Sequence, residues 1–371
     1  MATDCRNCFS FQGNGSPYSC LAVFPWTMRS LEILWGGSLQ RDSSKEKWRN
    51  MLREWTGAIT LGGTGEVIVK FMAPGPNGTP RQPIRVTIPK LKEVHFPVGA
   101  MSWALSHDNA LSPLLVFSCR RLLFVIDLNA ATGHGIQNHT RPAVSKLQGH
   151  GGAITSIATH PRNPSWICTT SEDFTARIYD ISLPPSKNAD DNPCWTPGYG
   201  PSKGGVPHGL RSSEEEGTGL GRCVVVLVGN KTGGHQAAVM SSAFHPTLPA
   251  IATCGVDRAI KIWRMQPRGE ALVREDKPMF STDRIHRAMV LSVAWLDETT
   301  LVTHSGPVLV HKEAPRDNEA GTLCVWSWYG LERFFPPGQS HDQNWLRGCV
   351  LVSMNPPPFG DDCSPPAGFS R

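Results

Sequence analysis

Short apolar stretches bounded by Gly, Pro, Asn and Asp recur along the chain, and the pattern becomes regular from Lys92 onward. Segments 98–105, 114–119 and 122–128 predict three strands of one antiparallel unit, with Arg120 and Arg121 in a tight turn. Segments 290–295, 301–305 and 322–328 predict three more strands. Many short strands with turn residues between them are typical of an all-β fold.

Two segments in the middle of the chain repeat the same order of residues. Each holds a Gly-His pair, an Asp and an aromatic residue, namely Gly149-His150, Asp173 and Tyr179 in the first and Gly234-His235, Asp257 and Trp263 in the second. His and Asp are 23 residues apart in the first and 22 in the second, and Asp and the aromatic are 6 apart in both. This spacing is the Gly-His to Trp-Asp signature of a β-propeller blade. We therefore expect an all-β WD-repeat propeller, a fold that usually binds other macromolecules.

The polar residues of the repeat have a mechanical explanation. The His, a Ser or Thr, the Asp and the aromatic can form one hydrogen-bonded chain that joins an entry loop, a strand and a turn. Buried polar groups have to be paired in some such way. We therefore interpret the repeat residues as structural rather than catalytic: His150, Asp173, Tyr179, His235, Asp257, Trp263 and, in a further blade, His286.

The other segments divide the chain around a propeller that we expect over residues 17–355. Residues 1–16 predict a flexible tail, and 356–371 a Pro/Gly-rich tail. Residues 36–92 do not match a blade and are expected to be irregular, with a loop over 73–90. Residues 184–220 are rich in Pro, Gly, Ser and charge, which predicts a disordered insertion. Residues 307–320 predict a second insertion.

The blade count is lower than a closed ring requires. The pattern supports four blades, part of a first and the start of another near Trp345. Propellers close their ring, and WD-type rings usually have about seven blades. Either the degenerate regions hide blades, or the chain is a truncated or mis-spliced product, and we expect an incomplete propeller.

The segment from Lys45 to Trp55 has the strongest helical pattern in the chain. Trp48, Met51, Leu52 and Trp55 fall on one face, and the opposite face is mostly charged. Such a helix could dock a partner. Amphipathicity is ordinary for any surface helix, so we favour a helix packed on its own propeller, or translated intron.

Composition and motifs exclude several other classes of protein. Cys5 and Cys8 form a single C-x-x-C pair, whereas structural zinc needs four ligands. No phosphate-binding loop, nucleophile elbow or H-E-x-x-H motif occurs. We therefore expect no enzyme activity, cofactor or metal. The net charge of +5 is scattered, so sequence-specific nucleic-acid binding is not expected. No signal peptide or apolar stretch of about 18 residues is present, so no membrane association is expected.

Residues 144–306 carry a more specific pattern. The segments are 149–154 with 160–164, 254–258 with 261–264, and the stretch Phe280-Ser281-Thr282 followed by Ile285-His286-Arg287. Together they resemble the extra sex combs or embryonic ectoderm development (EED) family, WD-repeat subunits of Polycomb repressive complex 2. The resemblance implies a nuclear, non-catalytic subunit that holds a SET-domain histone methyltransferase, works with other Polycomb subunits and represses transcription.

The resemblance also implies an aromatic cage that reads trimethyl-lysine on the histone H3 tail. A quaternary ammonium ion is attracted to the faces of several aromatic rings. The candidates here are Trp345, Phe96 and Tyr18, with Trp328-Tyr329 as an alternative match to the first. The alternative interpretation is that these aromatic residues pack in the core.

Two other functions remain open at the level of sequence. One is a general WD-repeat adaptor, such as the substrate receptor of a ubiquitin ligase. The other is a truncated, non-functional paralogue.

Overall fold

The computed structural model describes residues 18–30, 34, 42–72, 74–75, 78–87, 97–106, 112–129, 144–195, 206–228, 233–265, 271–307 and 320–336. The chain forms two compact units, Met1–Trp328 and Tyr329–Arg371. The described part of the second unit contains one short helix, α5 (Leu331–Phe334). All the described strands belong to the first unit.

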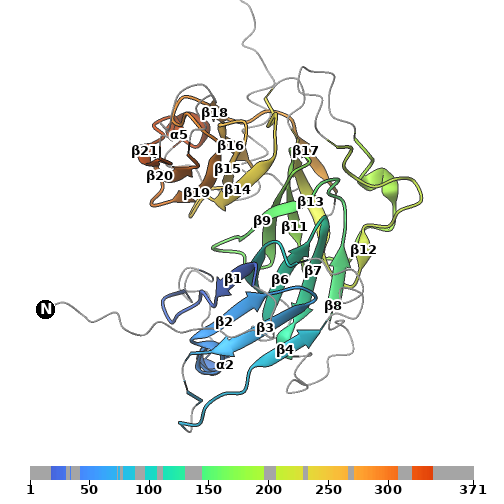
Figure 1. Ribbon diagram of the computed structural model, residues 1–371, viewed down its shortest axis with the longest axis vertical. Coiled ribbons are helices and arrows are strands. Elements are labelled where there is room, and N and C mark those ends of the chain that lie inside the picture. Colours follow the sequence, from blue (N-terminus) through green and yellow to red (C-terminus); the bar gives the residue numbers. More distant parts are fainter. Residues whose placement is uncertain are drawn as a thin grey trace, which may run out of the picture. The chain divides into compact units, whose positions relative to one another are not determined.

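Five sheets are found in the described part of the first unit (Figure 1). The first contains β1 (Cys20–Val23), β2 (Ala58–Gly62), β3 (Glu66–Phe71) and β4 (Ile84–Thr87). The second contains β5 (Met101–Leu105), β6 (Pro113–Cys119), β7 (Leu122–Asp127), β8 (Val144–Leu147) and β12 (Gly217–Thr218). The third contains β9 (Ile154–Thr159), β10 (Trp166–Ser171), β11 (Ala176–Asp180), β13 (Arg222–Leu227) and β17 (Val273–Glu275).

The fourth sheet contains β14 (Val239–Phe244), β15 (Ala250–Gly255), β16 (Ile260–Arg264) and β18 (Phe280–Thr282). The fifth contains β19 (Val290–Trp295), β20 (Thr300–Ser305) and β21 (Leu323–Ser327). Neighbouring strands pair antiparallel except β13 with β17, which pair parallel. The prediction of an all-β fold is confirmed, as are the strands predicted over 98–128 and 290–328.

Side chains connect the first strand of each sheet, which we call its inner strand, to the first strand of the next sheet. β1 contacts β5, β5 contacts β9, β9 contacts β14, and β14 contacts β19. In each pair a side chain donates a hydrogen bond to a main-chain carbonyl of the neighbouring inner strand. The donors and acceptors are Trp103 Nε1 and Ala22 O (3.3 Å), Thr159 Oγ1 and Trp103 O (2.6 Å), Thr155 Oγ1 and Val239 O, and Trp295 Nε1 and Ala243 O (3.1 Å). Indole and hydroxyl donors therefore link successive sheets at their inner edges.

The expectation of an irregular segment over 36–92 was wrong, because it contains three strands of the first sheet. Most of β2 and β3 is buried, so they show continuous apolar runs instead of alternation. The helix α2 (Asp42–Trp55) also separates β1 from β2, which shifts the strands out of the repeat spacing. The segment 36–92 therefore contains strands that the sequence pattern did not reveal, which agrees with the first of the two explanations given above for the low blade count.

The predicted helix forms as α2, and its apolar face packs on the protein's own sheets. Trp48, Met51, Leu52 and Trp55 are all buried in the core shared by the first and second sheets. The Trp48 indole donates to Thr27 O (3.3 Å), and the rings of Trp55 and Trp103 are 5.9 Å apart. The interpretation of a helix packed on its own propeller is confirmed for this face.

The segment 184–220 is folded wherever it is described, so the expectation of a disordered insertion was wrong for those residues. It contains a 3-10 turn (Ala189–Asp191) and β12, which pairs with β8 of the preceding sheet. Trp195 also bridges to His208. The buried side chains of Glu216 and His208 anchor the segment 184–220 to the sheets. A polar composition suggested disorder, but these polar groups find buried partners. Of the second insertion, 308–319 lie outside the described residues.

Candidate functional site

In the fourth sheet four side chains form one hydrogen-bonded chain. The Trp263 indole N–H donates to Thr253 Oγ1 (2.8 Å), which lies 2.8 Å from His235 Nε2. On the other side of the ring, His235 Nδ1 lies 3.0 Å from each oxygen of Asp257. Because an ionised carboxylate only accepts, Nδ1 carries the proton and Nε2 accepts from the hydroxyl. The chain links β16, β15, the entry to β14 and the β15–β16 turn.

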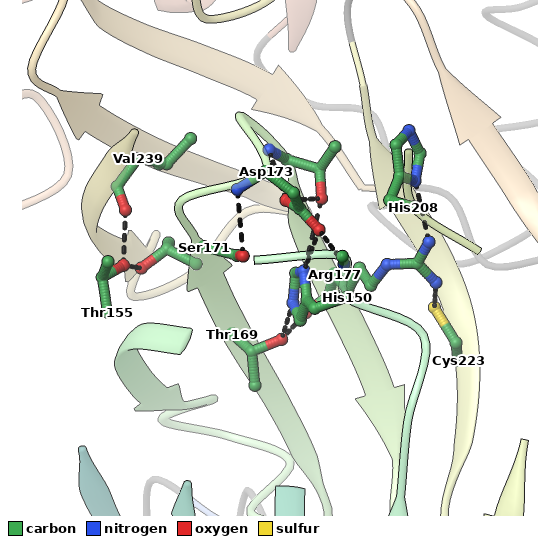
Figure 2. A network of polar contacts seen from close by, with 12 residues as sticks. His150, Thr155, Thr169, Ser171, Asp173, Arg177, His208, Cys223 and Val239 are labelled. Atoms are coloured by element: carbon green, nitrogen blue, oxygen red, sulfur yellow. Dashed lines mark hydrogen bonds and ion pairs between the residues drawn. The ribbon is translucent and has the colours of Figure 1, made fainter. Parts of the chain in front are cut away.

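The third sheet repeats the centre of this chain (Figure 2). His150 Nδ1 lies 2.9 Å from Asp173 Oδ2, and Nε2 lies 2.7 Å from Thr169 Oγ1. Asp173 also accepts from the Gly151 amide (2.8 Å), the Thr175 amide (3.0 Å) and the Thr175 hydroxyl (2.7 Å). Its carboxylate therefore holds the entry loop and the turn together.

The aromatic position of the third sheet departs from the fourth. Tyr179 pairs with Ile167 across the ladder and is buried among apolar side chains. A phenol has no donor where the indole N–H of Trp263 lies. Thr169 instead approaches Arg177 O (3.4 Å).

The fifth sheet builds the chain with threonine in place of aspartate. Trp326 Nε1 donates to Thr303 Oγ1 (3.2 Å), and Thr303 Oγ1 lies 2.7 Å from His286 Nε2. His286 Nδ1 lies 2.9 Å from Thr322 Oγ1. Thr322 comes after the second insertion, so spacing alone did not identify it. The sequence signal that could have identified Thr322 is a hydroxyl-bearing residue directly after the insertion.

Burial and the interaction with each other set the protonation of His150 and Asp173. Burial lowers the pKa of His150, more than the nearby carboxylate raises it. Burial raises the pKa of Asp173, but its interactions with His150 and with Arg177 outweigh that effect and hold the pKa well below its ordinary value. The pair is therefore a neutral imidazole donating to an ionised carboxylate.

The Thr-His-Asp arrangement has the same connectivity as a hydrolase triad, yet its hydroxyl cannot reach a substrate. A nucleophilic hydroxyl has to be exposed to an acyl carbon. Thr169 and Thr253 are both 0% exposed, and Thr253 already accepts the Trp263 indole N–H. These hydroxyls therefore cannot take the nucleophile's role, and the arrangement holds the turn in place.

A second polar network joins the third sheet to its insertion. Arg177 is fully buried, and Figure 2 shows its guanidinium reaching His208 and Cys223. Arg177 Nη2 donates to His208 Nδ1 (2.9 Å), and Nη1 donates to Asn192 Oδ1 (3.2 Å) and lies 3.8 Å from Cys223 Sγ. Burial lowers the pKa of His208 to about 3 and raises the pKa of Cys223 to about 12, so both are neutral around Arg177.

A buried carboxylate completes the anchoring of the insertion. Glu216 accepts the backbone amides of Cys223 (2.7 Å) and Ser186 (2.8 Å). One carboxylate oxygen therefore bonds to β13 and the other to the start of the insertion. Sequence reasoning missed both Arg177 and Glu216, because neither belongs to the repeat signature.

The cage candidates are placed only in part. Tyr18 is half-buried just before β1, and a side chain at Gly63 would contact its ring. Phe96 and Trp345 lie outside the described residues. Of the alternative pair, Trp328 is buried with its ring 6.0 Å from Phe280, whereas Tyr329 is 89% exposed. Buried Trp328 packs in the core.

Within the described ranges no cluster of three or more His, Cys, Asp or Glu side chains is arranged to hold a metal ion. Among the helices that the structure describes, none has the length and apolar character needed to span a membrane.

Comparison with known proteins supports the repeat and the resemblance. The family description "WD domain, G-beta repeat" matches residues 141–180 and 221–264, which contain the His150 and His235 chains. The chain is 30% identical over 168 residues to Polycomb group protein FIE1 of Zea mays, covering 45% of this chain and 26% of that protein. It is 26% identical over 159 residues to Polycomb protein EED of Chaetomium thermophilum, covering 42% of this chain and 22% of that protein. The chain therefore carries WD repeats and is similar to the Polycomb FIE and EED proteins. The sequence resemblance is thereby confirmed.

The fold comparison agrees with a WD-repeat propeller. The crystal structure of Chaetomium thermophilum polycomb repressive complex 2 contains a chain that superposes with a TM-score of 0.53 at 16% identity, covering 87% of this chain and 52% of that one. At this identity the likeness concerns the fold. The alignments with these Polycomb relatives span about a quarter of the relatives' length.

Proposed function

We propose that this WD-repeat protein is a non-catalytic scaffold subunit of a Polycomb-type histone H3 lysine methyltransferase complex in the nucleus. Its predicted partners are a SET-domain methyltransferase, other Polycomb subunits and the histone H3 tail. The observation that carries the proposal is the similarity to Polycomb FIE1 and EED proteins over a region of 42–45% of the chain.

The geometry supports a binding role over catalysis. The polar residues of the repeat are consumed in buried hydrogen bonds, and their hydroxyls lie away from solvent. Rigid turns and connections at the ends of the sheets are the parts left to contact other molecules, as is usual for functional loops on a stable scaffold. A scaffold subunit needs a surface of this kind to bind its partners, and it needs no reactive group.

Purification of the tagged full chain from nuclear extract tests the assembly. We expect a SET-domain methyltransferase and its Polycomb companions to co-purify, as identified by mass spectrometry. The matched control is Asp173→Ala, which removes the carboxylate that holds the third sheet's turn and should lower recovery. Recovery of ubiquitin-ligase subunits would support the adaptor function instead. Recovery of chaperones alone would contradict a folded scaffold.

The histone-reading part of the proposal rests on Trp345, Phe96 and Tyr18. Each ring of a cage contributes about 0.5–2 kcal/mol of cation–π attraction. We therefore expect Trp345→Ala to weaken binding of a trimethyl-lysine H3 peptide by roughly twofold to thirtyfold, measured by fluorescence anisotropy. The unmethylated peptide is the control. Unchanged binding by a folded variant would remove Trp345 from the cage.

A further inference from the structure

The exposed side of α2 carries a line of positive charges. Lys45, Arg49 and Arg53 are all exposed and follow one another at every fourth position of the helix. Residues four apart in an α-helix lie on the same side, about 6 Å apart along the axis. The three cations therefore form a line about 12 Å long, which we call the basic row.

A second row lies beside the basic row, displaced by one residue or about 100° around the helix axis. It consists of Glu46, Asn50 and Glu54, which are also exposed. Its two carboxylates border the basic row and do not interrupt it. The solvent side of α2 is therefore a positive line with negative charge along one edge.

This sorting of charges does little for the helix itself. Like charges four residues apart repel each other, whereas a glutamate four residues before a lysine stabilises a helix. Between 45 and 54 no pair of opposite charges has that spacing. Glu46 and Arg49 are three residues apart, but none of the ion pairs between described residues joins side chains of α2. Arg53 Nη1 donates to a neutral group, Asn50 Oδ1 (3.5 Å). The basic row therefore has no anionic partner within the described part of the chain.

The opposite face of α2 limits the kinds of ligand that fit. Trp48, Met51, Leu52 and Trp55 are buried in the core. A helix that binds a membrane surface inserts its apolar face among the lipids, and here that face is already covered. A ligand therefore has to meet α2 from its charged side, by electrostatic complementarity.

The last turn of α2 is held by an arginine from the segment before β4. Arg81 Nη2 donates to Arg53 O (2.7 Å), and Arg81 Nη1 donates to Glu54 O. The same guanidinium lies 5.0 Å from the centre of the Phe71 ring. These bonds satisfy carbonyl groups that the end of a helix leaves open. The basic row is thus presented on an anchored element, which reduces the ordering cost of binding.

We propose that the basic row binds an acidic helix of a partner protein that carries carboxylates at every fourth position. Such a helix has the same rise as α2, so three carboxylates meet three cations at once. Arginine favours the contact because its guanidinium binds a carboxylate through two parallel hydrogen bonds. A nucleic-acid backbone fits less well, because Glu46 and Glu54 border the row and repel a continuous line of phosphates. The proposal goes beyond the scaffold function and does not depend on which complex the chain joins.

The test is fluorescence anisotropy of a labelled, alanine-rich helical peptide of about 20 residues with glutamate at every fourth position, titrated with the full chain. Low ionic strength is used because salt screens exposed charges. We expect R49E to weaken binding about threefold and K45E/R49E/R53E about tenfold or more, since each exposed ion pair contributes modestly. The triple variant should instead bind the corresponding lysine peptide. R49K should retain most of the binding.

Two matched controls separate the row from charge in general. K47E makes the same charge change on the same helix outside the basic row, because Lys47 is also exposed. An isomeric peptide has the same number of glutamates without the four-residue spacing. Equal losses for R49E and K47E would overturn the proposal, as would equal affinity of the wild-type chain for the two peptides. Equal melting temperatures of R49E and K47E ensure that the comparison reports binding.

Two further outcomes would assign the row to a different ligand. Tighter binding of a labelled mixed-sequence DNA duplex than of the glutamate peptide, lost in R49E, would overturn the proposal in favour of nucleic acid. A wild-type dimer that R49E dissociates, measured by size-exclusion chromatography with light scattering, would overturn it in favour of a second copy of this chain.

Discussion

Replacement of Asp173 by alanine measures how much the repeat chain contributes to stability. The carboxylate is 0% exposed and accepts from His150 Nδ1, the Gly151 amide, and the amide and hydroxyl of Thr175. Alanine leaves three N–H donors without an acceptor, and each such group costs about 1–3 kcal/mol when buried. Water can reach the half-buried Gly151, so the lower end of this range applies to it.

We therefore expect Asp173→Ala to lower the free energy of unfolding by about 3–5 kcal/mol. The assay is urea unfolding of the purified chain, followed by tryptophan fluorescence. Glu172→Ala is the matched control, because Glu172 precedes Asp173 in the same turn and is exposed. It should change the free energy of unfolding by less than about 0.5 kcal/mol. A loss below about 1 kcal/mol for Asp173→Ala would refute the structural interpretation of the repeat.

Three further perturbations test other parts of the structure. Burial lowers the pKa of His160 to about 4, and its Nδ1 accepts a hydrogen bond from the Asn163 amide (2.9 Å). The stability that the neutral His160 contributes is therefore fully present above pH 6.5 and is lost as the pH falls from 6.5 toward 4. The urea midpoint at pH 7.5 and pH 5 measures this loss, and an unchanged midpoint would contradict it. Arg177→Ala leaves His208 Nδ1 without the hydrogen bond from the guanidinium and should make the insertion over 184–220 sensitive to limited proteolysis before the sheets unfold. A rate of digestion equal to that of the wild-type chain would show that other contacts hold the insertion. Trp48→Ala should lower the free energy of unfolding by about 3–5 kcal/mol because the side chain is fully buried, while Arg49→Ala on the exposed face should have little effect in the same denaturation assay.

Repetition made the third and fourth sheets predictable from the sequence. A blade needs a His, a hydroxyl, an Asp and an aromatic at fixed positions, and these residues appear twice at nearly the same spacing. Short apolar stretches between turn residues located β5, β6 and β7 of the second sheet and the three strands of the fifth. The helix α2 was predictable because its four buried residues recur with the period of a helix.

Neighbouring elements decided what the local pattern could not. The first sheet escaped detection because α2 interrupts it and because strands buried on both faces lose their alternation. The insertion after β11 has the composition of a disordered segment, yet Arg177 of β11 and the Cys223 amide of β13 supply buried partners for Asn192 and Glu216 of the insertion. Those partners come from other parts of the chain.

The sequence by itself therefore determined which residues repeat, and with them the class of fold and the family resemblance. The tertiary structure decided that Thr322 takes the place of an aspartate and that the triad-like hydroxyls are buried away from solvent. The physical reason is that burial and pairing depend on which strands become neighbours, and register across a ladder is not written in the spacing along the chain.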